Sequence, residues 1–229
     1  MPTIVFATPK GGAGKSTSAV LLATELVSRG GAVTIIDADP NKPVSHWAKR
    51  SKTPDLLTVQ SDVSEDTIVD QIDEASRKSA FVIVDLEGTA SMMASYATSR
   101  ADLVIIPTQG SHLDAAESAK AIKLVQVQEK LFHRKIPFAI LFTRTSVAIR
   151  TRTFQSIEDQ FASNNIPMFK THLHEREAYR AIFSFGGMLK DLNESDVSNV
   201  KGAIINTHAY VSEVVGLLKK RAAKPKEMA

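Results

Sequence analysis

The chain has 229 residues, of which 43% are hydrophobic and 23% charged, and its formal net charge is +3. These are values of an ordinary globular domain, and so small a charge does not by itself indicate nucleic-acid binding. The absence of cysteine excludes disulfides, thiolate metal sites and thiol catalysis. No uncharged apolar run approaches the ~18 residues of a membrane span, so we expect no transmembrane helix and, with a strand beginning almost at once, no signal peptide.

Short apolar runs alternate with helical patterns along the chain, which predicts parallel β–α–β units. Strands are expected near residues 3–8, 32–37, 56–60, 81–85, 102–107 and 137–142. Helices are expected near residues 15–29, 43–50, 64–78, 114–130, 152–163, 175–183 and 198–221. The predicted fold class is therefore α/β, a doubly wound, mostly parallel sheet with helices on both faces. We expect one domain over residues 1–221, followed by a basic, disordered tail over residues 222–229.

A glycine-rich loop, PKGGAGKST at residues 9–17, lies between the first strand and the first helix. In this setting glycines let the backbone wrap around phosphates, and the helix N-terminus faces the anion. Lys15 would reach the β- and γ-phosphates and Ser16 would bind Mg²⁺. The expected ATP-binding residues of the loop are Gly11, Gly12, Ala13, Gly14, Lys15, Ser16 and Thr17. A standard P-loop has glycine at the position of Pro9. It has no counterpart of Lys10, which is an additional lysine in this chain.

The loop resembles the deviant Walker A motif of the ParA/MinD family of P-loop ATPases. The resemblance covers about residues 3–218 and is greatest to the short ParA proteins, while residues 174–179 also resemble VirC1-like relatives. It implies that Lys10 crosses a dimer interface to the ATP of the partner subunit, and that Thr17 contacts the α-phosphate. With Lys15 and Asp39, Lys10 would then belong to the catalytic set.

Three aspartates follow expected strands, and the carboxyl ends of parallel strands meet at the ligand crevice of such a sheet. The segment Asp37–Asn41 resembles the switch I element of ParA proteins, which implies that Asp39 orients the attacking water and Asp37 lies near the metal. Asp85 ends an apolar run like a Walker B carboxylate and would act on Mg²⁺ through water. The expected metal-binding residues are therefore Ser16, Asp37 and Asp85.

Later segments are expected to complete the nucleotide site. Gly88 follows Asp85 at a distance where its N–H could meet the γ-phosphate, although the family's small pair after the aspartate is replaced here by Leu86 and Glu87. We interpret Glu87 as a local acid without a catalytic role. Residues 105–114 resemble a segment near the dimer face of relatives. Thr143 and Arg144 end a strand where relatives contact adenine, and Arg144 could equally be a solvated arginine.

The nucleotide chemistry is compatible with several functions. The leading hypothesis is a ParA-type ATPase for DNA segregation, an ATP hydrolase with weak basal activity that uses ATP and Mg²⁺. It would form an ATP-dependent homodimer, bind DNA nonspecifically and release it when a centromere-binding adaptor protein stimulates hydrolysis, in the cytoplasm on the nucleoid. The alternatives are a MinD-type membrane-associated positioning ATPase and a VirC1-like accessory ATPase of DNA transfer. The lack of cysteine argues against iron-protein relatives.

Charge distribution bears on the choice between these functions. No acid occurs between Glu129 and Glu158, whereas several basic residues fall there, and further basic residues follow the last helix. The candidate DNA-binding residues are Arg150, Arg152, Lys219, Lys220, Arg221 and Lys224. A solvated surface would have the same composition. In the last helix an apolar block precedes the basic block, which indicates a core-packed helix with a charged tip more than an interfacial anchor.

Overall fold

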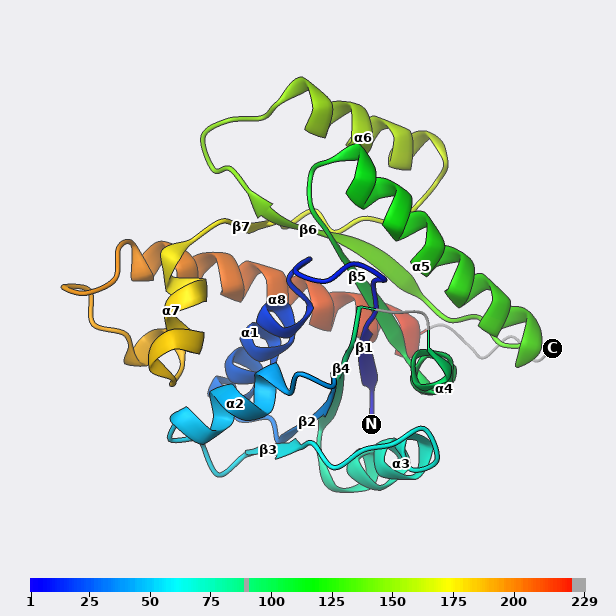
Figure 1. The fold of residues 1–229 in the computed structure, drawn as a ribbon, viewed down its shortest axis with the longest axis horizontal. Helices are drawn as coiled ribbons and strands as arrows, with labels where there is room; N and C mark the ends of the chain where they lie inside the picture. The colour runs from blue at the N-terminus through cyan, green and yellow to red at the C-terminus, as the bar shows by residue number, and fades with distance from the viewer. Residues whose placement is uncertain (89–90, 224–229) are drawn as a thin grey trace.

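The structure is a computed structural model and describes residues 1–88 and 91–223. Seven parallel strands form one sheet in the order β3-β2-β4-β1-β5-β6-β7 (Figure 1). Their bounds are β1 Thr3–Phe6, β2 Val33–Ala38, β3 Leu57–Gln60, β4 Phe81–Leu86, β5 Leu103–Thr108, β6 Phe138–Thr145 and β7 Leu173–His174. The predicted doubly wound, parallel sheet is confirmed.

Helices cover both faces of this sheet. Their bounds are α1 Lys15–Ser28, α2 Pro43–Arg50, α3 Ile68–Lys78, α4 Met92–Arg100, α5 His112–Leu131, α6 Arg152–Ser163, α7 Glu177–Phe185 and α8 Val200–Ala222, with a 3₁₀ turn at Leu189–Asp191. One face carries α1, α2, α7 and α8, and the other carries α3, α4 and α5 (Figure 1). Through Ile157 and Phe161, α6 packs into the second face.

Two apolar cores result, one on each side of the sheet. In β1, Ile4 and Phe6 point into the first core and Val5 into the second, and all three are fully buried. Because successive strand side chains point to opposite faces, a strand covered on both faces needs apolar residues throughout. This requirement explains the uninterrupted apolar runs of the central strands.

All the expected strands and helices are present, but α4, β7 and the 3₁₀ turn were not predicted. The buried residues of α4 are small, so its sequence has no strong helical periodicity; its N-cap Ser91 accepts a hydrogen bond from the Ala94 N–H at 3.2 Å. The third helix begins at Ile68 and not at residue 64, because the Ser64 N–H bonds to the Thr67 hydroxyl at 3.0 Å in a turn before it.

The last helix belongs to the core. Tyr210, Val211 and Val214 of α8 are fully buried in the first core, as its block pattern predicted. Within the described part of the chain, no helix is long and apolar enough to cross a membrane. The predicted domain boundary at residue 221 falls in the last turn of α8. Most of the predicted tail, including Lys224, lies outside the described residues.

Trp47 joins α2 to the connection that follows α7. Its side chain is 1% exposed, and its indole N–H donates to the carbonyl of Gly187 at 3.0 Å. We expect Trp47→Ala to lower the free energy of unfolding by about 3–5 kcal/mol, because it leaves a cavity and an unpaired carbonyl. Urea denaturation checks this, with the exposed neighbour His46→Ala as control. A loss below about 1 kcal/mol would show that the core closes over the site.

Candidate nucleotide-binding site

The glycine-rich loop connects β1 to α1 at the carboxyl edge of the sheet. Gly12 and Gly14 have φ of 74° and 97°, in the left-handed region that side chains rarely adopt. Gly14 is the N-cap of α1, so the loop turns directly into the helix. The free N–H groups of the first helical turn therefore lie beside the loop, as an anion site requires.

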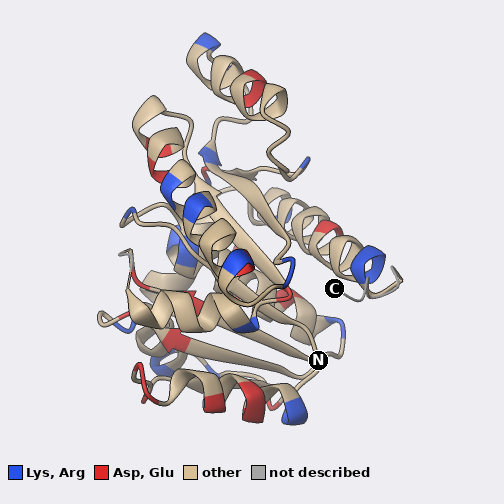
Figure 2. Ribbon diagram, turned by 90° about the vertical axis from the view of Figure 1, so that its right-hand side faces the viewer, with Lys and Arg blue, Asp and Glu red and all other residues tan. Residues whose placement is uncertain are grey.

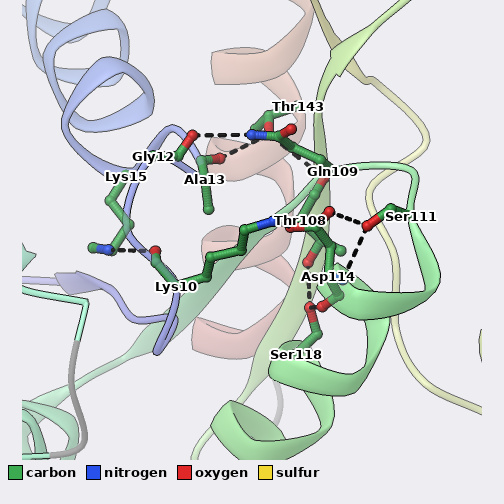
Figure 3. Close-up of polar contacts among 10 residues, drawn as sticks. All are labelled: Lys10, Gly12, Ala13, Lys15, Thr108, Gln109, Ser111, Asp114, Ser118 and Thr143. Carbon is green, nitrogen blue, oxygen red and sulfur yellow. Dashed lines mark hydrogen bonds and ion pairs between the residues drawn. The ribbon is translucent and has the colours of Figure 1, made fainter.

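Residues of β6 and of the segment after β5 hold the loop in shape (Figure 3). The Gln109 side chain donates to the carbonyl of Gly12 at 3.0 Å, and the Thr143 hydroxyl donates to the carbonyl of Ala13 at 2.7 Å. Thr143 was predicted to contact adenine, and its hydroxyl here supports the loop. Gln109, from the segment that resembles a dimer-face element, was not predicted to touch the loop. The conformation of the loop therefore depends on Gln109 and Thr143 as well as on its own glycines.

Lys15 lies at the floor of the site. Its side chain is buried, and its ammonium group donates to the carbonyls of Lys10 and Thr8 at 3.2 and 3.4 Å. Burial lowers the pKa of Lys15, and nearby carboxylates act in the opposite direction: Asp85, Asp39 and Glu87. Phosphate oxygens are stronger partners for an ammonium group than carbonyls are. Lys15 is therefore placed to exchange these carbonyls for a phosphate.

Asp37 and Asp85 stand side by side, because β2 and β4 pair in register at these residues. Both are fully buried. One oxygen of Asp37 accepts from the N–H and hydroxyl of Ser45, both at 2.7 Å. The other Asp37 oxygen and both Asp85 oxygens have no hydrogen-bond partner among the described residues. Burial raises the pKa of Asp85 to about 7 and also raises the pKa of Asp37.

Buried carboxylate oxygens without donors fit a hard divalent cation such as Mg²⁺. The Ser16 hydroxyl lies close enough to Asp85 to lower the pKa of this carboxyl group, so the two predicted ligands lie together. Over the described residues, no group of three or more acidic or histidine side chains could hold a metal by itself. Mg²⁺ normally keeps waters and binds through one or two carboxylates plus substrate phosphates. The residues present fit that mode of binding.

A cavity of about 460 Å³ opens in front of the loop, lined by loop residues together with Asp39, Asn41, Glu87, Gly88 and Arg144. Asp39, which directly follows β2, accepts from the N–H and side-chain amide of Asn41 at 2.8 and 3.0 Å. Its carboxylate is thereby held at the mouth of the cavity. This position suits an anionic group that orients a water molecule.

The loop after β4 closes against the glycine-rich loop. A Cβ on Gly88 would lie 2.9 Å from the nitrogen of Gly11, so only glycine allows this approach. Glu87 lines the cavity and raises the pKa of Lys15, so it is not remote from the site. The interpretation of Glu87 as a local acid without a catalytic role stays a prediction. The two residues that follow Gly88 lie outside the described part of the chain.

A smaller hollow of about 50 Å³ continues from the cavity, past Gly14 and Thr17. Arg144 borders both spaces, and its φ of 52° turns the chain there. The hollow is completed by Leu173 of β7 and by Tyr179 of α7, which the sequence did not indicate. Its position beside the loop fits the base end of a nucleotide.

The predicted DNA-binding residues fall into two separate groups. Arg150 and Arg152 follow the carboxyl end of β6, and Arg150 pairs with Glu158 at 2.5 Å. At the opposite edge of the sheet Arg221 pairs at 3.2 Å with Asp102, which directly precedes β5. Lys and Arg are likewise spread over several helices in Figure 2. Within the described chain, Arg150 and Arg221 therefore lie at opposite edges of the sheet.

Asp85→Asn tests the burial of the carboxylate pair. Between about pH 4 and 7 the native Asp85 holds a proton that the unfolded chain has lost, so its contribution to stability falls as pH rises and is constant above about pH 7. The melting-temperature advantage of Asp85→Asn over wild type, measured in EDTA, should therefore grow from about pH 5 to pH 7.5. Asp66→Asn, at an exposed position, is the control. A pH-independent difference would contradict the buried state of Asp85.

Comparison with known proteins agrees with this site. Residues 1–220 match the family model described as VirC1 protein. The ParA protein of Rhizobium radiobacter is 42% identical over 214 residues, which cover 93% of this chain and 96% of that protein.

Solved structures share the fold at low identity. Apo McdA from Cyanothece has a TM-score of 0.76 at 18% identity, covering 94% of this chain and 100% of its own. A plasmid partition protein from Borrelia burgdorferi, bound to AMPPNP, has a TM-score of 0.66 at 17% identity, covering 93% and 99%. The sequence matches and the glycine-rich loop with its second lysine lead to one conclusion: the chain belongs to the VirC1 family and is related to the ParA proteins, with the fold of the ParA/MinD P-loop ATPases.

Proposed function

We propose that the protein is a ParA-type ATPase that dimerises on ATP, binds DNA nonspecifically while dimeric and releases it after hydrolysis. The observation that carries the proposal is the divergence of the two loop lysines (Figure 3). Lys15 lines the cavity of its own subunit, whereas the Lys10 side chain extends away from it toward α5. A cation beside a phosphate site that does not serve its own phosphates is suited to serve those of a second subunit.

In the proposed dimer two subunits enclose two ATP molecules, and this chain's residues divide the work. Lys15 and the partner's Lys10 offset the charge that develops on the transferred phosphoryl group. Asp39 orients the attacking water, Ser16, Asp37 and Asp85 hold the metal, and Gly88 offers its N–H to the γ-phosphate. A Mg²⁺ ion held by these residues would supply positive charge that offsets part of the phosphate charge. A subunit alone has only Lys15 at its ATP, so hydrolysis by the monomer is slow.

The cellular part of the proposal rests on relatives and on charge. Proteins similar to this chain are named ParA and plasmid partition protein. A centromere-binding adaptor would stimulate hydrolysis and connect the DNA-bound dimer in the cytoplasm to its cargo. Most large apolar residues of α8 are buried in the first core or packed against it, with Ile205 exposed, and this packing disfavours a MinD-type anchor. Because the matching family model is VirC1, an accessory role in DNA transfer is the second candidate.

Lys10→Ala separates the two lysines. We expect the variant to bind a fluorescent ATP analogue as a monomer, with an affinity within about twofold of wild type, and to lose ATP-dependent dimerisation, because it lacks the cation for the partner's phosphates. Lys15→Ala should lose nucleotide binding itself. Sedimentation with ATP gives the oligomeric state, and the exposed Lys123→Ala on α5 is the control. A normal ATP dimer of Lys10→Ala would refute the proposed dimer.

The DNA step is tested in the Asp39→Ala background, where hydrolysis should be blocked. Binding to random-sequence duplex DNA should require ATP, be absent with ADP and weaken steeply with salt. Arg150→Ala/Arg152→Ala and Lys219→Ala/Lys220→Ala test the two edges separately, and the edge that contacts phosphates should show the smaller salt dependence after substitution. If no DNA binds in either nucleotide state, DNA segregation is excluded and anionic vesicles and protein cargo become the targets.

A further inference from the structure

Lys10 makes an ion pair within its own subunit that the proposed function does not use. Its ammonium nitrogen lies 2.7 Å from a carboxylate oxygen of Asp114, which is 104 residues further along the chain (Figure 3). The Asp114 side chain is 3% exposed, whereas the Lys10 side chain is 39% exposed. The pair therefore joins a buried anion to a lysine that solvent reaches.

Asp114 is fixed in place by its surroundings at the start of α5. Its second oxygen accepts from the hydroxyl of Ser111, and its own N–H donates to that hydroxyl at 3.2 Å. Ser111 is the N-cap of α5, and the helix N-terminus favours a negative charge in this first turn. The Ser118 hydroxyl donates to the Asp114 carbonyl at 2.9 Å. If the pair separates, Lys10 with its flexible stem is the residue that moves.

Lys10 is held at both of its ends. Its carbonyl accepts from the ammonium group of Lys15 at 3.2 Å, while its side chain binds Asp114. A phosphate bound in the same subunit competes for Lys15 and so removes the first contact. Phosphates of the partner subunit compete for the Lys10 ammonium group and so remove the second. Nucleotide thus competes with both contacts of Lys10: ATP in the same subunit competes with the first, and ATP in the partner subunit competes with the second.

From this arrangement we infer that Asp114 is a positioning residue, which retains Lys10 on its own subunit until ATP in a second subunit draws the lysine across. The inference rests on the proposed function, whose dimer it explains. Separating a buried carboxylate from its cation is unfavourable, although the partial exposure of Lys10 reduces the penalty. Only a partner that offers several anionic oxygens reverses the balance. The ion pair therefore opposes dimerisation in the absence of ATP.

Asp114→Asn tests the inference, because it keeps the size of the side chain and removes its charge. We expect the ATP-dependent dimer of the variant to form at a roughly tenfold lower protein concentration than that of wild type, about 1.4 kcal/mol in association. Sedimentation with ATP, with ADP and without nucleotide gives the dissociation constants. Glu117→Gln, which removes a partly exposed ion pair with Lys120 one turn along α5, should leave these dissociation constants unchanged.

A double variant shows whether the effect acts through the lysine. Lys10→Ala/Asp114→Asn should fail to dimerise, like Lys10→Ala, whereas a merely structural effect of Asp114 would persist without Lys10. If Asp114→Asn does not fold, Ser111→Ala weakens the same anchor and should shift the dimer constant in the same direction by a smaller factor.

Three results are distinguishable. A dimer of Asp114→Asn that is weaker than wild type, or equal to it, overturns the inference and leaves the proposed ATP dimer intact. A double variant that dimerises as well as Asp114→Asn overturns the inference and also the proposed role of Lys10 in the dimer, because it dimerises without that lysine. A wild-type protein that stays monomeric with ATP refutes the proposed function, and the inference with it.

Discussion

The pairing of β2 with β4 places two carboxylates next to each other inside the protein, and the other parts of the site are arranged around this pair. Asp37 and Asp85 occupy the same register position and are fully buried, yet three of their four oxygens have no hydrogen-bond donor among the described residues. Buried anions without partners oppose folding. Such an arrangement persists where a bound cation completes it, so stability is exchanged here for a function.

The glycine-rich loop shows a related dependence on the whole fold. Its backbone conformation requires glycine at residues 12 and 14, but its position depends on side chains of β6 and of the segment after β5. Both strands lie on the side of β1 away from β2 and β4. The loop is therefore held between the two halves of the sheet. A ligand bound there contacts groups from both halves.

The two lysines of the loop differ in what their surroundings allow. Lys15 is buried among carbonyls and carboxylates of the same chain, and its charge is stabilised chiefly by Asp85 and Asp39. Lys10 is partly exposed and pairs with one buried carboxylate of α5. One lysine is thus an internal part of the nucleotide site. The other lies where a second molecule can reach it.

The sequence by itself determined the fold class and the chemistry of the loop. Apolar runs that alternate with helical segments define parallel strands covered on both faces. The spacing of Gly12, Gly14, Lys15 and Ser16 is local, so the motif is recognisable without knowledge of the fold. The same holds for aspartates at strand ends, because the carboxyl edges of parallel strands converge. The helix α4 was not predicted, because its buried residues are small and its sequence pattern lacks large apolar side chains.

Tertiary structure alone decided which distant residues meet. The contacts of Lys10 with Asp114, of Gln109 with Gly12 and of Thr143 with Ala13 join residues about 100 positions or more apart. Strand order, which no local pattern encodes, brings them together. It also placed Arg150 and Arg221 at opposite edges of the sheet, although both belong to basic stretches of sequence. Composition records that charges are present, whereas the path of the chain fixes which surface they share.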